Sequence, residues 1–131
     1  MSLTTRGIGA TIALAAMTVF ANAQLSPNWQ TCTGNPDIEW DLQIKSCSTL
    51  IQSGAESKEN VAIAFYNRAL AYEDMGDYDR AIADYSEAIR LNPNEADALL
   101  YRGLNKQRKG DKAGAEADIA AAKRINPNIG N

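Results

Sequence analysis

Apolar and small side chains recur at helical spacing through the middle of the chain, in two stripes separated by a polar break. The first stripe runs from Ala62 to Tyr72 and the second from Ala81 to Ile89, and this spacing predicts two amphipathic helices. Gly76 lies between them, where glycine commonly ends a helix in a left-handed conformation. Asp77 or Asp79 is then the expected N-cap of the second helix.

One sequence pattern occurs twice in the chain. GDYDRAIADYSEAIRLNP spans Gly76–Pro93, and GDKAGAEADIAAAKRINP spans Gly110–Pro127, at an offset of 34 residues. The proline that ends each copy disfavours helical geometry in the residue before it and so ends the unit. A period of this length predicts stacked helix-turn-helix units.

The repeated unit resembles the tetratricopeptide repeat (TPR) family. The positions that carry the resemblance in the first copy are Phe65, Ala69, Tyr72, Ala81, Tyr85, Ala88 and Pro93. Those of the second copy are Leu99, Gly103, Lys106, Ala115, Ile119, Ala122 and Pro127. Lys106 departs from the aromatic residue of the family pattern, and Arg68 and Arg102 replace its usual leucine. The resemblance implies an all-α, right-handed α-solenoid.

A partial third unit lies upstream. DLQIKSCSTLIQ, at 41–52, aligns with DRAIADYSEAIR, at 79–90, so it is expected to be a second helix without a full first helix. The chain then divides into an irregular strap at 24–40, a partial repeat helix and loop at 41–60, one repeat at 61–95 and a terminal repeat at 96–128. This gives about two and a half repeats.

The first 23 residues have the pattern of a cleaved signal peptide. Arg6 precedes an apolar run from Ile8 to Phe20, and Ala21-Asn22-Ala23 forms a small-residue cleavage site. A transmembrane anchor is the alternative, but the run is shorter than the roughly 20 residues that span a bilayer. We therefore expect an exported protein, periplasmic or secreted in a Gram-negative bacterium, with no stable membrane insertion of the mature chain.

Cys32 and Cys47 are the two cysteines of the sequence. In an exported chain an even count favours a disulfide, and two reduced thiols are the alternative. A bridge between them would hold the strap over the open N-terminal end of the stack and replace the missing helix.

The second copy changes two apolar positions to charged ones. Ile82 becomes Glu116, and Ile89 becomes Lys123. A terminal repeat has no neighbour and needs a polar outer face. We expect these charges to cap the solenoid.

Charge and residue types argue against most catalytic chemistry. The formal net charge is −3, with 13 basic and 16 acidic residues and no histidine. A mildly acidic chain without a large basic patch is a poor nucleic-acid binder, and lack of histidine removes the commonest general base and neutral metal ligand. We expect no catalytic residues, no metal site and no cofactor.

The resemblance implies a groove lined by the first helix of each repeat, which binds extended or helical peptides. Carried over position by position, its candidate residues are Ile63, Tyr66, Asn67, Leu70, Glu73, Asp97, Leu100, Leu104 and Arg108. The function expected is a non-enzymatic adaptor or scaffold that binds a protein or peptide partner and is monomeric. A self-associating structural module of an envelope assembly is the alternative.

Overall fold

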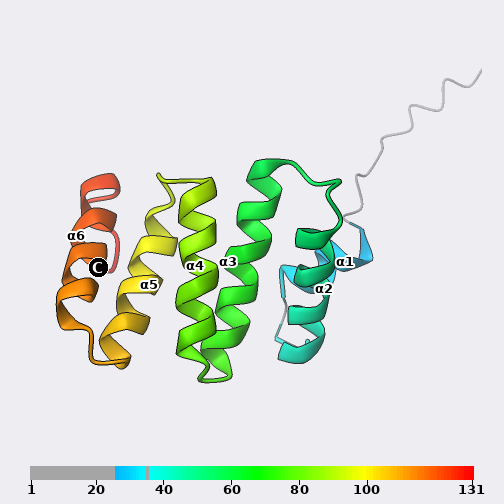
Figure 1. Ribbon diagram of the computed structural model, residues 1–131, viewed down its shortest axis with the longest axis horizontal. Helices are drawn as coiled ribbons and strands as arrows, with labels where there is room; N and C mark the ends of the chain where they lie inside the picture. Colours follow the sequence, from blue (N-terminus) through cyan, green and yellow to red (C-terminus); the bar gives the residue numbers. More distant parts are fainter. Residues whose placement is uncertain (1–25, 35) are drawn as a thin grey trace, which may run out of the picture.

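The computed structural model describes residues 26–34 and 36–131, so the expected signal peptide at 1–23 lies outside the described residues. The described part folds into helices that lie side by side in chain order, from α1 at one end to α6 at the other (Figure 1). Their bounds are α1 Pro27–Cys32, α2 Trp40–Gln52, α3 Lys58–Asp74, α4 Tyr78–Leu91, α5 Ala96–Arg108 and α6 Lys112–Ile125. No strand occurs among the described residues, and the prediction of an all-α solenoid is confirmed. None of these helices is long and apolar enough to span a membrane.

Helix ends follow the local chemistry of the repeat. Asp77 caps α4 by accepting a hydrogen bond from the Arg80 backbone N–H at 3.2 Å. Before it, Gly76 has a φ of +79°, and the Asp77 N–H donates to the Tyr72 carbonyl at 2.8 Å. This is the Schellman arrangement that a C-terminal glycine allows. The cap and the glycine together reverse the chain within three residues.

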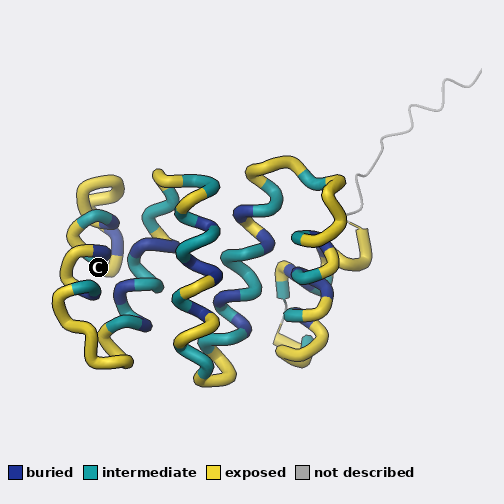
Figure 2. Tube along the Cα trace, in the orientation of Figure 1, coloured by how far each residue is buried: buried dark blue, intermediate teal, exposed yellow. Residues whose placement is uncertain are grey.

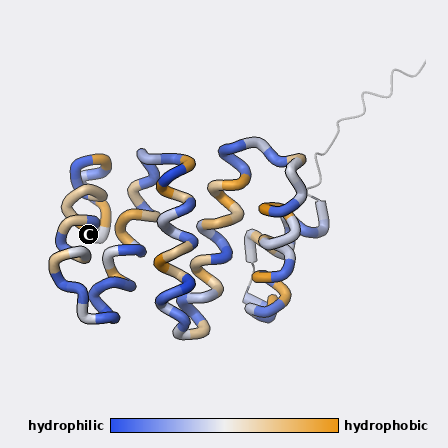
Figure 3. The backbone as a smooth tube through the Cα atoms, viewed as in Figure 1, coloured by the Kyte–Doolittle hydropathy of each residue, from blue (hydrophilic) through white to orange (hydrophobic). Residues whose placement is uncertain are grey.

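Small residues let paired helices approach closely. Ala69 and Ala81, on α3 and α4, are both fully buried. At Gly103 on α5, an added Cβ would lie 3.1 Å from the Ala115 carbonyl oxygen of α6, so a larger residue there would press against the α6 backbone. Figure 2 shows buried segments in the middles of α3, α4 and α5, with the connecting turns exposed. Figure 3 shows hydrophobic and hydrophilic positions interspersed along these helices, as amphipathic packing requires.

The N-terminal segment differs from the irregular strap expected for 24–40. Pro27–Cys32 form the short helix α1, with Pro27 in its first turn and Ser26 accepting a hydrogen bond from the Trp29 N–H at 3.4 Å. Both features favour a helix start. A six-residue helix is too short to be stable alone, so its stability must come from tertiary contacts.

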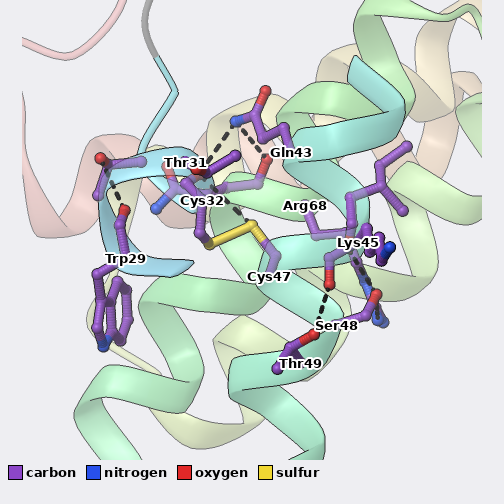
Figure 4. The surroundings of a disulfide bond; sticks show 12 residues. Trp29, Thr31, Cys32, Gln43, Lys45, Cys47, Ser48, Thr49 and Arg68 are labelled. Atoms are coloured by element: carbon purple, nitrogen blue, oxygen red, sulfur yellow. Dashed lines mark hydrogen bonds between the residues drawn. A yellow bond between two sulfur atoms is a disulfide. The ribbon is translucent and has the colours of Figure 1, made fainter. Parts of the chain in front are cut away.

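A disulfide between Cys32 and Cys47 joins α1 to α2, with the two Cα atoms 4.8 Å apart (Figure 4). Both cysteines are fully buried and cluster with Trp29, Leu50 and Ala64. The Trp29 indole N–H also donates to the Glu56 carboxylate at 2.9 Å. Helix α1 therefore covers α2 and takes the place of the missing first helix.

Two arginines that depart from the family pattern form buried ion pairs. Arg68 on α3 donates to both carboxylate oxygens of Asp84 on α4, at 2.7 and 2.8 Å. Its remaining terminal nitrogen donates to the Ser48 hydroxyl on α2 at 2.9 Å. One guanidinium thus joins three helices and links one repeat to the unit before it.

The arrangement recurs one repeat later. Arg102 donates to both oxygens of Asp118 at 2.7 Å and to the Ser86 hydroxyl at 3.1 Å. Lys106 adds a second cation to Asp118, at 2.8 Å, which accounts for a lysine in place of an aromatic residue. The position 34 residues after Ser86 is Ala120, which has no hydroxyl to accept such a hydrogen bond.

The pKa of Asp118 gives this site a predictable pH dependence. Burial opposes ionisation, but the hydrogen bonds from Arg102 and Lys106 outweigh it and hold the pKa of Asp118 below its ordinary value. A carboxyl whose pKa is lower in the folded chain stabilises the fold above its unfolded pKa, about 4, and loses that contribution as the pH falls through the folded pKa.

We therefore expect the free energy of unfolding of Asp118→Asn to fall less between pH 7 and about pH 3 than that of the parent. Urea unfolding at the two pH values measures this difference. An equal fall in parent and variant would contradict the role assigned to the Asp118 carboxylate.

The C-terminal end is covered by a segment to which the sequence reasoning assigned no role. After α6 the chain turns back (Figure 1), and Ile129 is buried, 6% exposed, against Leu99 and Ala122. Glu116 and Lys123 on α6 are exposed, as expected for a polar outer face. The outer face of α6 thus carries surface charge, and Ile129 of the following segment packs against α5 and α6; a capping role for this end stays a prediction.

Ile129→Ala should lower the free energy of unfolding by about 2 kcal/mol, the lower end for truncating a buried isoleucine, because the chain end can partly collapse into the space. Denaturant unfolding measures this, with Ile125→Ala as the control since Ile125 is 41% exposed. Equal losses in the two variants would show that Ile129 does not seal the stack.

Candidate functional site

A pocket opens where the beginning of α3, the end of α4 and the beginning of α5 meet. It has a volume of about 280 Å³ and is lined by Glu59, Ala62, Ile63, Tyr66, Ala88, Asn92, Glu95 and Asp97. The lining residues of α3 recur at three- and four-residue steps, which places them on one helix face. We call this feature the acidic pocket.

The acidic pocket combines apolar walls with carboxylates. Ala62, Ile63 and Ala88 supply aliphatic surface, and Ile63 is 48% exposed. Glu59, Glu95 and Asp97 supply the charge, and none of them forms an ion pair with another described residue. The Asn92 side-chain amide donates to Glu95 at 3.3 Å. No basic residue lines the pocket.

Tyr66 joins the acidic pocket to the core. Its ring centroid lies 5.8 Å from that of Tyr85 and 6.2 Å from that of Tyr101, both in edge-on geometry. Burial raises the pKa of the Tyr66 phenol above its ordinary value, and nearby Tyr101, Asp97 and Glu95 raise it further. Tyr66 therefore keeps its proton at physiological pH and lies in a negative electrostatic field.

Two further candidate residues, Glu73 and Arg108, form an ion pair with each other. Arg108 donates to one Glu73 oxygen at 2.5 Å, while the Tyr85 hydroxyl and the Asn105 side-chain amide donate to the other, at 3.0 and 2.8 Å. Burial, followed by the charge of Glu73, raises the pKa of Tyr85 and keeps this donor protonated. The contacts of Glu73 and Arg108 account for them as part of the α3–α5 interface.

The remaining candidates are spread along the two helices. Leu70 is half-buried against the cluster that contains Tyr85. Leu100 packs in the C-terminal cluster, and an added Cβ at Gly130 would lie 3.9 Å from it. Leu104 is half-buried, and the Asn67 backbone carbonyl accepts from Gln43 at 3.4 Å. A binding role for these side chains stays a prediction.

The structure thus brings together Ile63, Tyr66 and Asp97 of the nine sequence candidates. The sequence reasoning missed Glu59 and Glu95, which lie in the first turn of α3 and at the N-cap of α5. The available signal was the charge of residues 24–95, which hold 5 basic and 12 acidic side chains. That imbalance shows excess negative charge without showing where it gathers.

Comparison with known families agrees with this architecture. The sequence model of the family described as "Tetratricopeptide repeat" matches residues 62–95, which span most of α3, all of α4 and the turn into α5. A search of curated proteins found no match. The repeat is a protein-interaction module and is generally non-enzymatic. Residues 62–95 are therefore a tetratricopeptide repeat, and α5 and α6 form a second helix pair of the same kind beside it.

Proposed function

We propose that the chain is a non-enzymatic adaptor or scaffold of the bacterial periplasm that binds a protein partner beside α3 and α5. The observation that carries the proposal is the acidic pocket, where an exposed apolar side chain stands beside carboxylates that have no ion-pair partner among the described residues. A concave apolar surface with a few polar groups is the usual form of a ligand site. Repeats of this family supply such surfaces for peptide segments.

The buried disulfide supports export, because such bonds persist in oxidising compartments. Fractionation followed by N-terminal sequencing tests this part directly. We expect the protein in the periplasmic fraction with Gln24 as its first residue. Protein recovered from the cytoplasm with Met1 retained would contradict the proposal.

Site-specific photo-crosslinking tests the binding surface. A photoreactive amino acid at Ile63 should capture a discrete partner, and the same amino acid at exposed Glu116 on α6 should not. Both positions are exposed, so neither replacement should disturb the fold. Mass spectrometry identifies the captured protein, and the purified partner should then compete with capture. Equal yields at the two positions would show that binding is not centred on the acidic pocket.

A further inference from the structure

We infer that the acidic pocket accepts a lysine or arginine side chain of the partner segment. This rests on the proposed function and specifies its ligand chemistry: a cationic head on an aliphatic stem, with no free carboxylate close by.

Two helix beginnings supply the charge. Glu59 is in the first turn of α3 and Asp97 in the first turn of α5, while Glu95 is the N-cap of α5. Acidic residues stabilise helix N-termini, which alone would explain Glu59 and Asp97. Glu95, however, makes no side-chain cap hydrogen bond. Because both helix starts face the same cavity, their carboxylates gather where the lining has no compensating cation.

Outside the acidic pocket, basic side chains pair with carboxylates. Arg68, Arg102, Lys106 and Arg108 each pair with a carboxylate. The carboxylates of the acidic pocket have no such pair among the described residues. An incoming ammonium or guanidinium would therefore meet unpaired negative charge.

The walls of the acidic pocket suit the rest of such a side chain. Lysine and arginine bury their methylene stems against apolar surface and keep the charged head near polar groups. Ala62, Ile63 and Ala88 supply the apolar surface, and the Tyr66 ring adds a partner for a cation. A volume of about 280 Å³ is near the lower limit of ligand pockets and suits one long side chain.

The same charges disfavour other ligands. Like charges placed together across an interface oppose binding, so an acidic side chain or a peptide C-terminal carboxylate should be rejected. An uncharged aliphatic side chain would contact the walls and leave the carboxylates unpaired. Specificity for a cation thus follows from both attraction and exclusion.

Three capped tetrapeptides test the inference: acetyl-Ala-Lys-Leu-Ala-amide and its counterparts with norleucine or glutamate in place of lysine. Each is titrated to about 10 mM into the mature, disulfide-bonded protein labelled with nitrogen-15, and the amide chemical shifts are followed by NMR, which detects millimolar binding.

We expect the lysine peptide to bind at least about tenfold more tightly than the norleucine peptide, with amide shifts centred on 59–66 and 92–97. A gain of that size corresponds to one favourable charge-pair interaction. Added salt should weaken its binding.

Matched variants locate the effect. Glu95→Gln with Asp97→Asn should lower the affinity for the lysine peptide at least about fivefold. Glu39→Gln with Asp41→Asn is the control, because Glu39 and Asp41 hold the N-cap and first-turn positions of α2. The control should leave affinity unchanged while removing similar helix N-terminal charges.

Each other result overturns the inference. Equal binding of the norleucine peptide, preference for the glutamate peptide, equal loss in the α2 control, or no shift with any peptide would each do so. The proposed function fails separately. If Ile63 captures a partner but the lysine peptide does not bind, the ligand chemistry is wrong and the binding surface stands. If the lysine peptide binds at the acidic pocket but Ile63 captures no protein, the ligand chemistry stands and the proposed adaptor role fails.

Discussion

Asp84→Ala should lower the free energy of unfolding by about 3 kcal/mol, the lower end for breaking a buried ion pair. The Asp84 side chain is 8% exposed and accepts two hydrogen bonds from Arg68, itself 17% exposed. Its removal leaves a largely buried guanidinium between α3 and α4 that, among the described residues, keeps the Ser48 hydroxyl as its hydrogen-bond acceptor. The cost therefore comes mainly from the charge left without its partner.

Urea unfolding of three variants separates this from a general effect of losing a carboxylate. Glu87→Ala breaks the exposed pair with Arg90, whose side chain is 64% exposed, and should cost less than about 1 kcal/mol. Arg68→Leu with Asp84→Leu removes both charges and restores the leucine usual in the family, so we expect stability near that of the parent. If Asp84→Ala cost no more than Glu87→Ala, the Arg68 site would not hold the repeats together.

Replacing Cys32 and Cys47 together by alanine should lower the free energy of unfolding by about 2–4 kcal/mol. The bond closes a sequence separation of 15 residues, for which loop closure alone gives about 3 kcal/mol. Helix α1 has six residues, so without the bond its contacts through Trp29 must hold it against α2. We expect the end of the stack to loosen first.

Denaturant unfolding and the fluorescence of Trp29 measure the two parts of this prediction. Trp29 is 9% exposed whereas Trp40 is 47% exposed, so a Trp40→Phe background isolates the buried indole. Reduction of the parent should reproduce the loss of stability and shift Trp29 emission to longer wavelength. Free thiols in the native protein, or an unchanged midpoint after reduction, would contradict the anchoring role of the bond.

Much of the fold was predictable because the residues that start and end the helices of the repeat can be recognised in the local sequence. Gly76, Asp77 and Pro93 mark a helix end, a helix start and a stop within the sequence itself. Helix α1 carried too few residues for a periodic pattern, and tertiary contacts and the disulfide define it. The irregular strap was therefore the wrong expectation over Pro27–Cys32.

The arginine–aspartate ion pairs could not be predicted from the local sequence pattern. Arg68 and Arg102 were visible as departures, but their partners lie 16 residues away on the facing helix. A signal was present, because Asp84 and Asp118 recur at the offset of 34 residues that relates the two arginines. To recognise these residues as ion pairs, one must know which faces of the paired helices contact each other.

The lining of the acidic pocket was predicted only in part. Ile63 and Tyr66 were carried over from the positions of the family groove, whereas Glu95 belongs to the turn between two helices and has no place in a periodic pattern. Glu73 and Arg108 were predicted from position, but hydrogen bonds across α3, α4 and α5 occupy them. Leu100 is packed beside a tail whose return path the sequence does not indicate.

Carboxyl footprinting of the partner complex tests most directly the claim that a protein segment lies beside α3 and α5. The side chains of Glu59, Glu95 and Asp97 are modified with a carbodiimide and an amine in the free protein and in the complex with the protein captured at Ile63. We expect modification of these three to fall on binding while exposed Asp41 and Glu116 react as before. Unchanged labelling of the acidic pocket, with protection at Asp41 or Glu116, would contradict the account.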